Sequence, residues 1–153
     1  MGIKVKVVWT AETKPDFVSR AIMAFQRTPY SHVAIIFDGM ICHAIGEGVC
    51  FSPAADYLAD HVVVLERELE LACSAERFMG FIEGESGKEY SEAQLLLIAL
   101  GLKWFANGDE KRICSEFVAN IISKFGLELI RWEHLDHVTP KCLEKVLKPT
   151  RVA

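Results

Sequence analysis

The sequence lacks the features that mark several large classes of protein. Its five cysteines are an odd number and include no CxxC pair, which argues against a disulfide framework and favours a reducing compartment. The longest apolar run, residues 95–102, is far shorter than the roughly 20 residues that cross a membrane. The net charge of −4 and the pI near 5.7 give no charge-driven attraction to nucleic acid or to an anionic membrane. We therefore expect no nucleic-acid partner and no membrane span.

The amino-terminal residues show no targeting signal. Residues 3–9 alternate between charged and apolar side chains, without the continuous apolar stretch and small-residue cleavage site of a signal peptide. Gly2 would suit N-myristoylation, but Lys6 stands where that motif has Ser or Thr. The sequence therefore predicts a cytoplasmic protein.

Composition and periodicity predict one α+β domain over residues 1–153. Hydrophobic residues make up 51% of the chain and charged residues 25%, which is typical of a globular protein. Short strands gather early and helices late, so we expect a small antiparallel sheet packed on helices. The expected strands are 3–9, 31–37, 40–46, 48–51 and 61–69, and the expected helices are 16–27, 53–58, 75–84, 91–105, 114–125 and 140–147.

Cys114 is the first candidate for chemistry. The apolar residues after it recur with helical spacing, and the Asn107-Gly108-Asp109 loop precedes it, so Cys114 stands at the start of a helix. Free N–H groups and the positive end of the helix dipole favour a thiolate there. The alternative is a small buried hydrophobe, which is what most free cysteines are.

Two histidines form the second candidate. Asp38-Gly39 predicts a two-residue hairpin turn, which pairs Ile36 with Ile41 and places His32 and His43 on one face as diagonal neighbours. One imidazole could then hydrogen-bond the other, directly or nearly so. Two half-buried histidines satisfied by carbonyls or water are the alternative. Together with Cys114, the pair supplies a nucleophile, a base and an orienting group.

Five short motifs carry a family resemblance. They are Tyr30-Ser31-His32-Val33-Ala34-Ile35, Ile41-Cys42-His43-Ala44, Gly87-Lys88-Glu89-Tyr90-Ser91, Ile113-Cys114-Ser115-Glu116-Phe117-Val118 and Val138-Thr139-Pro140-Lys141-Cys142-Leu143. In this order they resemble the circularly permuted branch of the NlpC-type papain-like superfamily, in which the histidine strand precedes the cysteine helix. The resemblance implies a papain-like fold across nearly the whole chain.

The resemblance also implies roles for single residues. Cys114 would be the nucleophile, His32 the general base and His43 the third polar residue of a Cys-His-His triad. Many permuted members have Glu in place of His43, and a histidine there is similar to the lecithin:retinol acyltransferase group. Ala34 replaces the usual glycine of the strand. Tyr30, close to His32, is the predicted substrate contact.

The implied function is a cysteine hydrolase, a thiol peptidase or amidase that cleaves an amide bond through a thioester. Cell-wall peptide is one substrate in this bacterial and phage family, and a cytoplasmic enzyme would then need a phage or a secretion system to deliver it. One alternative is a lipid acyltransferase or phospholipase acting on acyl esters. Another is a non-catalytic papain-like binding module.

A zinc site is the remaining alternative. His134 and His137 would share one helix face, and His61 and four further cysteines are available. The pair lacks the Glu of an HExxH motif, and the apolar residues around it indicate an ordinary packed segment. We therefore expect no metal and no other cofactor.

Overall fold

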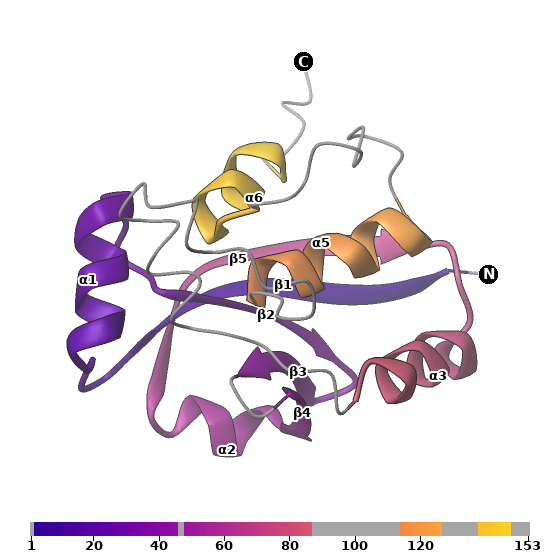
Figure 1. The fold of residues 1–153 in the computed structure, drawn as a ribbon. Coiled ribbons are helices and arrows are strands. Elements are labelled where there is room, and N and C mark those ends of the chain that lie inside the picture. Colours follow the sequence, from indigo (N-terminus) through magenta and orange to yellow (C-terminus); the bar gives the residue numbers. More distant parts are fainter. Residues whose placement is uncertain (1, 46–47, 87–113, 127–137, 148–153) are drawn as a thin grey trace.

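The computed structural model describes residues 2–45, 48–86, 114–126 and 138–147, and in these ranges it is a mixed α and β structure (Figure 1). The five strands form one antiparallel sheet in the order β4-β3-β2-β1-β5. The strands are β1 (Ile3–Glu12), β2 (His32–Phe37), β3 (Met40–Ile45), β4 (Gly48–Pro53) and β5 (His61–Leu71). The helices are α1 (Phe17–Gln26), α2 (Ala54–Leu58), α3 (Ala75–Glu85), α5 (Cys114–Phe125) and α6 (Pro140–Val146). The predicted α+β class is confirmed.

Alternation along the strands gives the sheet two different faces. Trp9, Val33 and Ile35 point to one face and share a core with α5, which runs across β2 and β3. Val8 and Ala34 point to the other face and pack with Ala54 and Tyr57 of α2. In Figure 1, α5 lies above the sheet and α2 below it. The sheet is therefore buried on both faces where these helices cover it.

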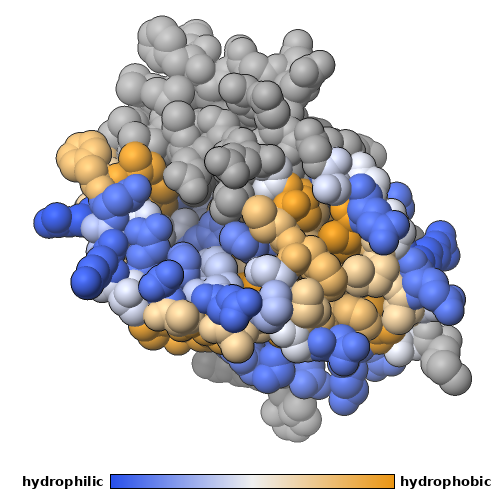
Figure 2. Space-filling view, turned by 90° about the horizontal axis from the view of Figure 1, so that it is seen from below, coloured by the Kyte–Doolittle hydropathy of each residue, from blue (hydrophilic) through white to orange (hydrophobic). Residues whose placement is uncertain are grey.

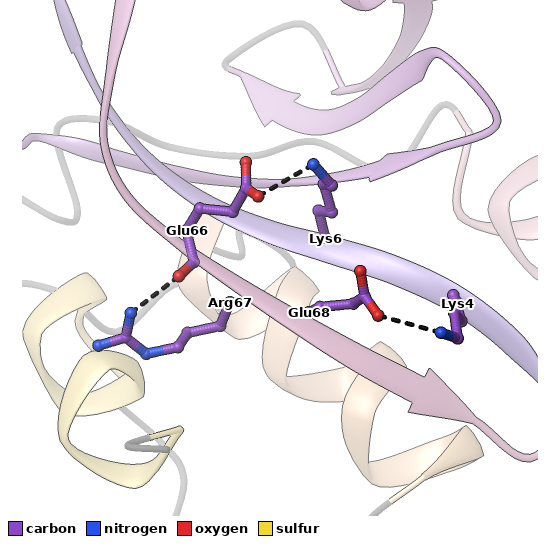
Figure 3. A network of polar contacts seen from close by, with 5 residues as sticks. All are labelled: Lys4, Lys6, Glu66, Arg67 and Glu68. Atoms are coloured by element: carbon purple, nitrogen blue, oxygen red, sulfur yellow. Dashed lines mark hydrogen bonds and ion pairs between the residues drawn. The ribbon is translucent and has the colours of Figure 1, made fainter.

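The face that α2 covers is open to solvent farther along β1. Lys4 bonds Glu68 at 3.3 Å and Lys6 bonds Glu66 at 2.9 Å, and all four side chains are exposed (Figure 3). Such exposed pairs add little to stability. Glu66 and Glu68 thus lie on a solvated face of β5. Seen from this side, apolar side chains gather toward α3 and hydrophilic ones toward α1 (Figure 2).

Local signals explain where the elements begin and turn. Asp38 and Gly39 have φ values of 49° and 73°, which are the left-handed conformations that a two-residue hairpin turn needs. The side chains of Asp16, Ser74 and Thr139 cap α1, α3 and α6.

β1 runs three residues beyond the predicted strand 3–9 because residues 10–12 still pair with β5. The predicted helix 91–105 lies outside the described residues. Within the described ranges, none of the helices has the length and apolar character to cross a membrane.

Trp9 ties the sheet to α6, and its hydrogen bond predicts a measurable loss of stability. The ring is fully buried, and its Nε1 donates to the carbonyl oxygen of Pro140 at 2.8 Å. The Trp9→Phe variant deletes this buried hydrogen bond and shrinks a packed ring, so we expect unfolding to become easier by about 2–4 kcal/mol. Urea denaturation measures this. Val146→Ala, an exposed change on α6, is the control and should stay within about 0.5 kcal/mol. An unchanged Trp9→Phe midpoint would contradict the role of this bond.

Candidate active site

His32 and His43 lie side by side on the α2 face of the sheet. The hairpin register is the predicted one, with Ile36 opposite Ile41 and Ile35 opposite Cys42. The two ring centroids are 5.5 Å apart and the ring planes meet at 89°, so one imidazole edge points at the face of the other. His43 is buried, while His32, the first residue of β2, is half-buried. The predicted proximity of the two histidines is confirmed.

The two rings are joined by packing and not by a hydrogen bond. His32 Nε2 and His43 Nδ1 are both enclosed, and neither has a hydrogen-bond partner among the described residues. Buried polar atoms in native proteins nearly always have partners, so exceptions are informative. An unpartnered imidazole nitrogen is available to take or give a proton in a reaction.

Burial keeps both imidazoles neutral. It lowers the pKa of His32 to about 3, and the positive charges of His43 and then His61 add to the effect. It lowers the pKa of His43 to about 4, with His61 as the second cause. At neutral pH, the site therefore holds two uncharged rings.

Tyr57 of α2 completes this group of rings, and sequence analysis assigned it no function. Its ring centroid is 4.7 Å from that of His43 and 6.3 Å from that of His32. Its hydroxyl is hydrogen-bonded to Thr10 Oγ1 at 2.8 Å. Burial is the main cause that raises the pKa of Tyr57, the Thr10 bond opposes it, and a negative charge on Cys114 raises it further. Cys114 therefore lies within electrostatic range of Tyr57, which in turn contacts both histidines.

A β-bulge brings His61 to the same place. Trp9 pairs with Leu65 but Thr10 pairs with Val63, so Val64 is an extra residue in β5. The bulge reverses which face the following side chains occupy, and His61 thus joins Thr10 on the α2 face. There its ring stacks on Tyr57 at 3.9 Å with 14° between the planes, and its Nδ1–H donates to the Tyr57 carbonyl at 3.0 Å.

Cys114 is the first residue of α5, as predicted, and only 6% of its surface is exposed. The next residue anchors the helix start, because the buried Ser115 hydroxyl donates to the Val138 carbonyl. Cys114 packs in the core cluster on the α5 face, whereas the histidine rings lie on the α2 face. Tyr57 packs against the imidazoles, and a negative charge on Cys114 acts on its hydroxyl.

The other predicted residues have structural surroundings. Tyr30 is buried, its hydroxyl donates to Glu144 of α6, and its ring lies 6.4 Å from that of Trp9. Its contact with a substrate stays a prediction. Cys42 is fully buried on the face opposite His43, and burial raises its pKa to about 12. Cys142 is exposed on α6.

No protein-family model matches this chain, and no curated protein is similar enough to match. Among the described residues, no group of three or more His, Cys, Asp or Glu side chains is placed to hold a metal ion. His134 and His137 lie outside those residues.

Proposed function

We propose that this protein is a cysteine hydrolase with a papain-like fold that cleaves an amide bond, with Cys114 as nucleophile and His32 and His43 as its partners. One observation carries the proposal: the imidazoles of His32 and His43 pack together, each with a buried nitrogen that has no partner among the described residues. The candidate nucleophile, Cys114, begins α5. A thiol at a helix start and two neutral imidazoles with unpartnered nitrogens are the parts that acyl transfer by cysteine requires.

The reaction would run in two halves. His32 takes the proton from the Cys114 thiol, the sulfur adds to the substrate carbonyl, and collapse of the adduct expels an amine that carries this proton away. His32 then takes a proton from water, whose oxygen attacks the thioester and releases the acid and the free thiol. Backbone N–H groups in the first turn of α5 would bind the oxyanion.

The neutral state of the imidazoles shapes the first step. Because the pKa of His32 is about 3, this ring is a weak base until a negative charge develops beside it. A thiolate formed at Cys114 would raise that pKa by attraction, so ionisation of the thiol and protonation of His32 would support each other.

Alkylation by iodoacetamide at pH 6.5 tests whether Cys114 is activated. Cys142 is exposed and Cys114 is buried, so accessibility alone would make Cys142 react first. We expect the reverse, with Cys114 modified at least tenfold faster, because the helix start and the imidazoles favour its thiolate. Peptide mass spectrometry at timed quenches measures both rates. In His32→Ala the advantage of Cys114 should disappear. Labelling of Cys142 ahead of Cys114 in the wild type would favour a non-catalytic binding module.

A second candidate function is acyl transfer from a lipid ester. The observation that favours it is the histidine at position 43, which packs against His32 where a carboxylate would be usual in the amidase branch. Incubation with muropeptides and, separately, with phospholipid vesicles distinguishes the two. Release of amino groups supports the amidase, and release of fatty acid with no peptide cleavage would replace it by the lipid enzyme.

A further inference from the structure

Tyr57 stands where it controls the geometry of the histidine pair. No hydrogen bond to the buried His43 Nδ1 fixes the orientation of that ring. The ring contacts of His43 are with the edge-on His32 and with Tyr57, and the Tyr57 contact is the shorter at 4.7 Å between centroids. The direction of the His43 imidazole therefore depends on packing against Tyr57.

Tyr57 itself is held from two sides. Its hydroxyl bonds Thr10 of β1 at 2.8 Å, and the ring of His61 stacks on it at 3.9 Å. His61 also bonds the backbone carbonyl of Tyr57, which ties α2 to the start of β5. Thr10 lies on this face by alternation along β1, and the β1–β5 bulge sets His61 on it. A bulge beside an active site commonly serves to re-aim a side chain.

We infer that Tyr57 is a positioning residue of the site: its ring, held by Thr10 and His61, sets the orientation of His43 and through it that of His32. This inference rests on the proposed hydrolase function. Tyr57 does not replace a member of the triad. It takes the place of the hydrogen bond that an orienting carboxylate would make, since a ring can fix an imidazole by contact where no acceptor is present.

Three variants separate the parts of this arrangement. Tyr57→Phe keeps the ring and removes the hydroxyl, Thr10→Val removes the partner of the same bond, and Tyr57→Leu removes the ring. The control is Thr13→Val, which deletes an exposed hydroxyl bonded to the Asp60 carbonyl near the same strand. The probes are iodoacetamide for the Cys114 thiol and p-nitrophenyl acetate for acyl transfer.

The expected rates of the variants follow from where Tyr57 and Thr10 lie. Tyr57→Phe and Thr10→Val should each slow Cys114 alkylation about three- to tenfold, and their combination no further, because both delete one bond. Tyr57→Leu should lower kcat for p-nitrophenyl acetate ten- to a hundredfold with KM within about threefold, because the ring orients an imidazole and does not bind the ester. Thr13→Val should match the wild type in both assays.

Several results would overturn the inference. A raised KM with unchanged kcat in Tyr57→Leu would make Tyr57 a substrate contact. Independent, multiplying losses in Tyr57→Phe and Thr10→Val would refute the shared bond. Fast Cys114 alkylation in the wild type with equal rates in all Tyr57 variants would refute the inference and leave the hydrolase standing. Slow alkylation of Cys114 in the wild type would refute both. Tyr57→Phe keeps the packed ring, so the test does not depend on whether Tyr57→Leu folds.

Discussion

Cys114→Ala is expected to reduce turnover by at least a thousandfold while the protein stays folded. The Cys114 sulfur is the protein atom that forms a bond to the substrate in the proposed mechanism. The stability cost is small, because exchanging sulfur for hydrogen at a buried site removes one atom and leaves α5 intact, which is about 1–2 kcal/mol. Ester or amide hydrolysis by the purified variant measures the loss, and thermal unfolding verifies the fold.

Cys142→Ala is the matched control for that experiment. It makes the same chemical change on α6, where the thiol is exposed, and hydrolysis should stay at the wild-type rate. If Cys114→Ala retained wild-type turnover in a preparation free of other hydrolases, Cys114 would not be the nucleophile and the proposed mechanism would be wrong.

Mild acid is expected to destabilise the protein through the histidine pair. In the unfolded chain an imidazole binds its proton near pH 6.5, whereas the folded pKa values are about 3 for His32 and about 4 for His43. Between these limits the unfolded state binds more protons, so stability falls as the pH drops below 6.5. At pH 5.5, one unit below the unfolded pKa, each neutral imidazole costs up to about 1.4 kcal/mol, and solvent screening lowers the share of the half-buried His32. We expect Tm to fall by about 4–8 °C between pH 7 and pH 5.5.

The variant His32→Gln, with a side chain that does not titrate in this range, isolates the cause. Its Tm should fall by about half as much over the same pH interval, whatever its value at pH 7. The exposed pairs Lys4–Glu68 and Lys6–Glu66 provide the comparison, because deleting them with Lys4→Gln and Lys6→Gln should leave the pH dependence unchanged. A wild-type Tm that is flat from pH 7 to pH 5.5 would show that the imidazoles are not buried neutral.

The sequence predicts the histidine hairpin well because only the turn and the alternation along the strands determine it. A two-residue turn at Asp38-Gly39 fixes the register, and the period of two along each strand then fixes which side chains share a face. The start of α5 at Cys114 is equally local, since it follows from helical spacing after a loop. Each of these features depends on residues close together in the chain.

The positions of Tyr57 and His61 beside the histidine pair could not be predicted from the sequence in the same way. α2 has five residues, too few for a helical period to show which side Tyr57 faces. Simple alternation along β5 puts His61 on the same face as Leu65, and only the bulge at Val64 moves it to the other. That bulge depends on how β5 pairs with β1, about fifty residues earlier in the chain, and no local pattern encodes it.

The hydrogen bonds of α6 carry a consequence for the order of folding. Pro140 accepts from Trp9, Lys141 donates to the Gln26 carbonyl, and Glu144 accepts from Tyr30, so this short helix closes on the first thirty residues. Joining positions 131 residues apart costs roughly 4 kcal/mol of chain entropy. The hairpin joins residues that are close in the chain and avoids most of this cost. During synthesis the early strands emerge long before α5 and α6, with the apolar side that α5 will cover still bare. A nascent chain at that stage exposes apolar surface of the kind that chaperones bind. Its native packing can form only after α5 and α6 have left the ribosome.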